Sequence, residues 1–176
     1  MCGIVGYTGH REASHILIEG LKKLEYRGYD SSGLAVENND GNVEIVKAKG
    51  RLSELITKTD NGNSIKGECG SAHTRWATHG EPSETNAHPH CSDDKTVIAV
   101  HNGIIENYKE LKEKLLSKKY TFYSETDTEV LTKLIDYYYK KYNVGPIDAL
   151  AKMMVRVRGS YAIAVMFKDY PGEIYI

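Results

Sequence analysis

The chain has 176 residues, of which 40% are hydrophobic, and its 23 basic side chains nearly balance 24 acidic ones, for a net charge of −1. This balance argues against nucleic acid or an anionic membrane as a partner, and no apolar run reaches the roughly 18 residues of a membrane span. Cysteines at positions 2, 69 and 91 lack the spacing of a secreted disulfide framework. We therefore predict one cytoplasmic globular domain over 1–176.

The first half of the chain predicts a strand, a helix, a hairpin and another strand. They are expected over 2–8, 13–27, 33–36 with 43–46, and 69–75. The helix has apolar residues at helical spacing and reaches Gly28, which suits a left-handed C-terminal cap. Asp40-Gly41 lies between the two hairpin strands, and glycine accepts the positive φ of a tight turn.

The second half predicts a long loop, a strand, three helices and a terminal hairpin. These cover 76–94, 96–102, 107–118, 128–139, a helix opened by Gly145-Pro146, and 160–167 with 173–176. Thr126 and Glu129 have the spacing of a capping box at the start of the second helix. Strand pairs separated by helices predict an α+β domain with mainly antiparallel sheets, and the chain lacks a glycine-rich nucleotide-binding motif.

Cys2 directly follows Met1, so removal of Met1 would place a thiol and a free α-amine on one residue. The pKa of an α-amine is near roughly 8 and that of a thiol near roughly 8.5, so the amine can accept the thiol proton at little thermodynamic cost. Nucleophile and base would then belong to the same residue. The alternative interpretation is a small buried residue at the start of a strand.

Five segments along the chain resemble the N-terminal glutaminase domain of the glucosamine-6-phosphate synthase family, the glutamine:fructose-6-phosphate aminotransferases (isomerising). They read MCGIVG at 1–6, LEYRGYDSSGL at 24–34, HTRWATHGEPSETNAHPH at 73–90, HNGIIENY at 101–108 and SETDTEV at 124–130. Such domains are class II glutamine amidotransferases of the N-terminal-nucleophile hydrolase superfamily. The resemblance implies a four-layer αββα sandwich. Family glutaminase domains continue for several more strands, so it also implies a chain truncated at its C-terminus.

The resemblance implies that Cys2 attacks the side-chain amide of glutamine and forms a γ-glutamyl thioester. Ammonia leaves, and water then releases glutamate. The tetrahedral intermediate carries negative charge on the former carbonyl oxygen, which requires hydrogen-bond donors nearby. The Asn102 amide and the Gly103 N–H match the family's oxyanion hole, whereas Asn-Gly by itself is also typical of a tight turn.

Free glutamine also carries an α-carboxylate and an α-ammonium group. A guanidinium binds a carboxylate through two parallel hydrogen bonds, and an ionised aspartate accepts from an ammonium. The resemblance assigns substrate binding to Arg75, Trp76, Thr78, His79 and Asp127, and a supporting role near the nucleophile to Arg27. Residues 76–80 would form a lid, with the Trp76 indole excluding water and gating ammonia. Without the resemblance, Asp127 fits a helix start and Arg75 a surface charge.

We expect no cofactor. We also expect no metal, because His88-Pro89-His90-Cys91 has the residue types of a zinc site but not the spacing. The resemblance implies L-glutamine as substrate. In the full-length enzyme it implies a sugar isomerase domain that binds fructose 6-phosphate, and a homo-oligomer. Two alternatives stay open: the glutaminase part of another class II amidotransferase, such as an amidophosphoribosyltransferase or asparagine synthetase, and a non-catalytic regulatory domain that binds glutamine.

Overall fold

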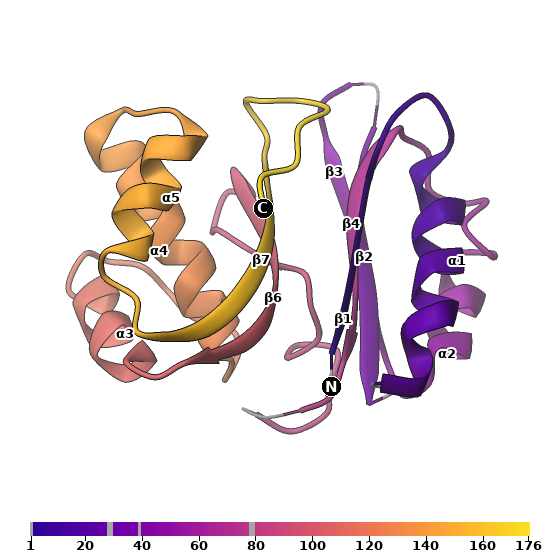
Figure 1. The fold of residues 1–176 in the computed structure, drawn as a ribbon, viewed down its shortest axis with the longest axis horizontal. Coiled ribbons are helices and arrows are strands. Elements are labelled where there is room, and N and C mark those ends of the chain that lie inside the picture. The colour runs from indigo at the N-terminus through magenta and orange to yellow at the C-terminus, as the bar shows by residue number, and fades with distance from the viewer. Residues whose placement is uncertain (1, 28–29, 39, 78–79) are drawn as a thin grey trace.

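The computed structural model describes residues 2–27, 30–38, 40–77 and 80–176. Two β-sheets face each other in the middle of the molecule, and helices cover the outer face of each sheet (Figure 1). All strand pairs within the sheets are antiparallel. The predicted α+β class and four-layer αββα arrangement are therefore confirmed.

The first sheet has four strands in the order β1-β4-β2-β3. Its strands are β1 (Gly3–Thr8), β2 (Ser31–Glu37), β3 (Val43–Lys49) and β4 (Cys69–Arg75), and its helices are α1 (Ala13–Leu24) and α2 (Leu52–Lys58). The apolar face of α1 presents Leu17 and Leu21 to Leu34 and Ala72 of the sheet, all of them completely buried. The helical spacing of these apolar residues makes α1 amphipathic, and burial of its apolar face against the sheet stabilises it.

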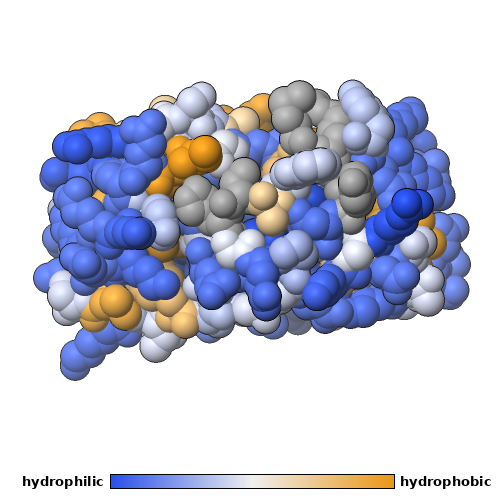
Figure 2. All heavy atoms as spheres, turned by 90° about the horizontal axis from the view of Figure 1, so that it is seen from below, coloured by the Kyte–Doolittle hydropathy of each residue, from blue (hydrophilic) through white to orange (hydrophobic). Residues whose placement is uncertain are grey.

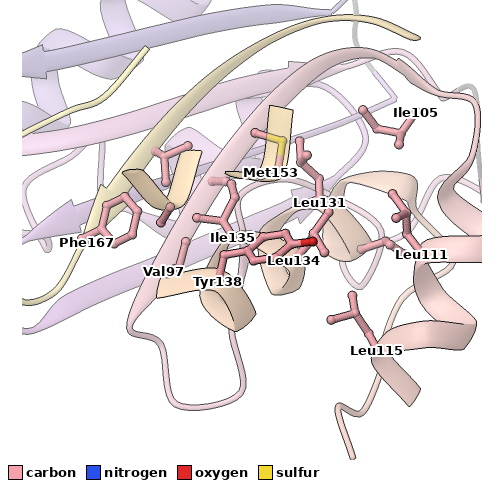
Figure 3. Close-up of a cluster of buried hydrophobic side chains, with 14 residues drawn as sticks. Val97, Ile105, Leu111, Leu115, Leu131, Leu134, Ile135, Tyr138, Met153 and Phe167 are labelled. Atoms are coloured by element: carbon pink, nitrogen blue, oxygen red, sulfur yellow. The ribbon is translucent and has the colours of Figure 1, made fainter. Parts of the chain in front are cut away.

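The second sheet has the order β5-β6-β7. Its strands are β5 (His90–Cys91), β6 (Val97–Ile105) and β7 (Gly159–Phe167), and its helices are α3 (Tyr108–Leu116), α4 (Asp127–Tyr142) and α5 (Pro146–Met154). Apolar side chains from the sheet and all three helices point toward one another and form the larger core (Figure 3). This core fixes the start of α4 relative to β6.

A buried chain segment also occupies the space between the two sheets. Residues 86–90 are buried in the middle of the long loop that precedes β6. A Cβ atom at Gly33 of β2 would lie only 2.2 Å from the His88 carbonyl oxygen, so this strand position requires glycine to admit the loop. The predicted long loop therefore contributes to the protein interior and contains the short strand β5, which the sequence did not predict.

Several boundaries differ from the predictions. The first helix ends at Leu24 and continues as a 3₁₀ turn over Glu25–Arg27, while the expected cap at Gly28 lies outside the described residues. Helix α2 was not predicted at all. The expected terminal strand 173–176 is reduced to one isolated bridge, in which Tyr175 and Val165 exchange two backbone hydrogen bonds of 2.9 Å.

The capping box at the start of α4 is half confirmed. The Thr126 hydroxyl accepts the Glu129 N–H at 3.2 Å, as predicted. The Glu129 carboxylate accepts the Tyr123 and Ser124 N–H groups instead of the Thr126 N–H. Glu129 also forms a fully buried ion pair with Lys133 at 2.8 Å. Its bonds to the two N–H groups anchor the preceding loop to the helix, and its negative charge stabilises the helix start.

No helix among the described residues is long and apolar enough to cross a membrane. The face seen from below, on the side of the N-terminus, is mainly hydrophilic and carries only scattered hydrophobic groups (Figure 2). The larger exposed apolar side chains of the described residues include Trp76, Ile104 and Val155. Two of these, Trp76 and Ile104, line the cavity that holds the candidate site.

Candidate active site

A cavity of about 680 Å³ lies where the ends of β1, β4, β6 and β7 approach the start of α4. Its volume is in the range of small-molecule sites, roughly 300 to 1,000 Å³. The predicted site residues that line it are Cys2, Arg75, Trp76, Asn102, Gly103 and Asp127. Thr78 and His79 lie outside the described residues, as does the side chain of Arg27. The fold thus brings together residues separated by more than one hundred positions in the sequence.

Cys2 lies immediately before β1 and is half-buried. Its Sγ atom accepts the Trp76 N–H at 3.2 Å and lies 3.5 Å from the Trp76 carbonyl oxygen. The pairing of β1 with β4 places residue 3 opposite residue 74, which explains why the thiol meets the backbone just after β4. Trp76 therefore contacts the sulfur through its backbone, while half of its surface is exposed to solvent.

Asn102 and Gly103 lie inside β6, so the tight-turn interpretation of Asn-Gly is wrong. Gly103 has φ +132°, and a Cβ atom there would lie 2.2 Å from the Ser160 carbonyl oxygen of β7. Only glycine fits this position. The Asn102 Nδ2 donates to the Cys2 carbonyl oxygen at 3.2 Å, so the amide donor already faces the residue that carries the thiol.

Asp127 is the first residue of α4 and is 4% exposed. One of its carboxylate oxygens accepts the Ile105 N–H at 2.8 Å, and this bond ties the helix start to the end of β6. The helix dipole favours an anion at this position. Asp127 thus has the helix-start role expected from its position, and its place in the cavity wall also allows it to meet a ligand cation.

Arg75 ends β4 and is 3% exposed, so the interpretation as a surface charge is wrong. Its guanidinium donates to the carbonyl oxygens of Gly80 at 3.0 Å and Glu81 at 3.3 Å, and lies 3.8 Å from Asp30 Oδ1. The Ala77 N–H donates to the other oxygen of Asp30. Arg75 and Asp30 together hold the two ends of the loop that begins at Trp76.

Two polar residues that support this site were not predicted from the sequence. Asp30 lies in the segment LEYRGYDSSGL that suggested the family resemblance, so its position there was an available signal. His73 lies two positions before Arg75, on the face of β4 that looks toward Asn102, and its Nε2 atom is 2.8 Å from Asn102 Oδ1. The alternation of side chains along a strand would have placed residues 73 and 75 on the same face.

Among the described residues, four buried histidines gather at the cavity: His73, His88, His90 and His101, none more than 5% exposed. His88 and His101 line the cavity, and His73 and His90 lie behind them. Burial lowers the pKa of His73 to about 3 and holds those of His88 and His90 well below the ordinary value of 6.5. These three rings are therefore neutral at neutral pH. Within the described part of the chain, no group of three or more histidine, cysteine or acidic side chains could hold a metal ion.

Comparison with known proteins gives one consistent match. The family model of the glutamine amidotransferase domain matches residues 73–174. A glutamine–fructose-6-phosphate aminotransferase (isomerizing) of Clostridium acetobutylicum is 54% identical over 174 residues, which cover 99% of this chain and 28% of that protein. The chain therefore spans about 28% of the length of this curated relative.

Solved structures agree with this match. Glutamine phosphoribosylpyrophosphate amidotransferase from B. subtilis superimposes with a TM-score of 0.80 at 26% identity, covering 96% of this chain and 35% of that one. The allosteric regulatory enzyme of purine biosynthesis gives 0.81 at 27% identity, covering 96% and 36%. The fold is that of the N-terminal-nucleophile hydrolases. By its matched residues and its fold, the chain belongs to the glutamine amidotransferase domain family.

Proposed function

We propose that residues 1–176 form a glutaminase domain that hydrolyses L-glutamine to glutamate and ammonia through a γ-glutamyl thioester on Cys2. The observation that carries the proposal is the convergence of a thiol, a side-chain amide donor and a glycine of positive φ on one cavity. Nucleophilic acyl transfer needs these parts: an attacking atom, and donors positioned where the oxyanion will form.

The first step of the proposed reaction forms the thioester. Once Met1 is removed, the α-amine of Cys2 accepts the thiol proton and Sγ attacks the side-chain carbonyl carbon of glutamine. Asn102 Nδ2 and the Gly103 N–H stabilise the resulting oxyanion. The C–N bond then breaks, and the ammonium of Cys2 gives its proton to the leaving nitrogen, which departs as ammonia. Water attacks the thioester in the second step, releases glutamate and restores the thiol.

We assign substrate selectivity to two charged residues that line the cavity. In this proposal Arg75 binds the α-carboxylate of glutamine, and Asp127 accepts from the α-ammonium. The near-complete burial of both side chains supports these roles, because solvent then screens their charges only weakly. Trp76, Thr78 and His79 complete the substrate contacts, and Arg27 supports the nucleophile region.

The names and lengths of the relatives support a proposal for the wider role of this domain. We propose that this domain supplies ammonia to a sugar isomerase domain that binds fructose 6-phosphate, within a cytoplasmic homo-oligomer that makes glucosamine 6-phosphate. The 54% identity to an aminotransferase of that name supports this substrate over that of a phosphoribosyl amidotransferase, to which the identity is 26%.

The test is glutamate release from glutamine by the intact native protein and by its Cys2→Ala variant, together with glutamine binding by calorimetry. We expect release by the parent protein and none by the variant. Binding of glutamine without release by the parent would contradict the glutaminase proposal and favour the non-catalytic binding domain. Equal release by both proteins would contradict the role of Cys2.

A further inference from the structure

His73 contacts the candidate oxyanion donor from the side opposite Cys2. Its ring is fully buried in β4, and its Nε2 lies 2.8 Å from Asn102 Oδ1. The other end of the Asn102 amide, Nδ2, donates to the Cys2 carbonyl oxygen at 3.2 Å. The amide is thus held at both ends. His73 itself is not among the residues that line the cavity.

The chemistry of the amide makes this contact directional. Oδ1 can only accept a hydrogen bond, so the His73 nitrogen that faces it must carry a proton. Because burial lowers the pKa of His73 to about 3, the ring is neutral at neutral pH, and its single proton then lies on Nε2. If the amide turned by 180°, its NH₂ group would meet the Nε2–H, and its oxygen would face the site of the developing negative charge.

The ring of His73 is fixed in turn by a row of packed groups. It stacks on His88 with 4.1 Å between ring centroids and 28° between ring planes. His88 Nδ1 accepts the His101 N–H at 3.4 Å, and His101 Nδ1 lies 2.8 Å from the Thr128 hydroxyl of α4. The imidazole of His73 therefore has little freedom to rotate away from Asn102 in this packed interior.

We propose that His73 is a positioning residue that orients the Asn102 amide so that Nδ2 faces the oxyanion formed when Cys2 attacks glutamine. The inference rests on the proposed glutaminase function and adds to it a residue that does not touch the substrate. A donor oriented before the reaction needs no reorganisation when charge develops, which is the basis of oxyanion stabilisation.

A pair of variants tests the role of the Nε2–H. His73→Gln keeps an N–H donor near the place of Nε2, whereas His73→Leu has a similar volume and no donor. In the intact native protein we expect His73→Leu to lower kcat about 10- to 100-fold with a much smaller change in KM. His73→Gln should recover most of the loss. His10→Leu, at an exposed histidine, is the control and should leave kcat unchanged.

A second measurement does not depend on the variants. Long-range proton–nitrogen NMR correlations on the unaltered protein with ¹⁵N-labelled histidine report which ring nitrogen of His73 carries the proton. We expect the Nε2–H tautomer, with no titration between pH 5 and pH 8. A proton on Nδ1 would overturn the proposal, because Nε2 could then not donate to Oδ1.

The outcomes separate this inference from the function on which it rests. An active parent protein with unchanged kcat in a folded His73→Leu variant would overturn the role of His73 and leave the glutaminase proposal standing. An equal loss of kcat in His73→Gln and His73→Leu would also overturn it, since the donor would then not matter. A parent protein without glutaminase activity would overturn the proposed function, and the positioning role with it.

Discussion

Replacement of Asn102 by alanine is the most informative single change at the site. The substitution removes Nδ2, which faces Cys2, and Oδ1, which pairs with His73 at 2.8 Å. Loss of one oxyanion donor lowers turnover by about 100-fold or more, equivalent to roughly 2.7 kcal/mol of transition-state stabilisation. Glutamine binding should change much less, because the charged ends of the substrate are assigned to Arg75 and Asp127.

The same substitution also has an expected effect on stability, which separates a folded variant from a damaged one. Removing Asn102 leaves the buried Nε2 of His73 without its partner, which should lower the free energy of unfolding by about 1 to 3 kcal/mol. The assay is kcat and KM for glutamate release, with thermal unfolding of the same samples. Unchanged kcat in a folded variant of an active parent would refute the assignment of Asn102 to the oxyanion hole.

Four further predictions address the backbone, the substrate contacts and pH. Gly103→Ala should lower the free energy of unfolding by about 3 kcal/mol, because the new Cβ would lie 2.2 Å from a carbonyl oxygen. Gly41→Ala is the control: this glycine also has positive φ but lies in open space, so the same substitution should lower the free energy of unfolding by only about 1 kcal/mol. Arg75→Lys should raise the KM for glutamine, since one ammonium cannot reproduce a two-pronged carboxylate contact; unchanged KM would contradict this contact. Asp127→Asn should weaken discrimination against α-N-acylated glutamine in competition assays, and equal use of both substrates by the parent would contradict the assignment. The pKa of His73 falls from 6.5 to about 3 on folding, so at pH 5 the unfolded state binds a proton that the folded state does not. The contribution of this residue to the free energy of unfolding should therefore be about 2 kcal/mol lower at pH 5 than at pH 7. Denaturation at the two pH values measures this loss, which should be absent in His73→Gln.

Local patterns predicted most of the regular elements because each element carries its own signal. The Asp40-Gly41 turn identified the hairpin of β2 and β3, and Gly145-Pro146 identified the start of α5. Helix α2 has only seven residues, too few for a clear apolar periodicity. Strand β5 has two residues and exists only because it pairs with β6, so no local pattern could indicate it.

The residues that meet at the cavity were more predictable than the contacts that support them. The family resemblance assigns Cys2, Asn102 and Asp127 to one site, and in the fold all three residues line one cavity. The bond between His73 and Asn102 joins residues 29 positions apart and depends on how the two sheets face each other. The burial of Arg75 likewise depends on the return of residues 80 and 81 over its guanidinium, which local sequence does not reveal.

The most direct test of the central claim compares two samples of the same protein that differ only in the presence of Met1. A peptide bond to Met1 makes the Cys2 nitrogen an amide, which is not basic near neutral pH, so the thiol loses its proposed base. Each sample is treated with a glutamine-like electrophile, and the label is located by intact mass and peptide mapping. We expect rapid labelling at Cys2 and glutamate release only after Met1 is removed. Equal labelling and equal turnover in both samples would contradict the claim that Cys2 acts as an N-terminal nucleophile with its own α-amine as base.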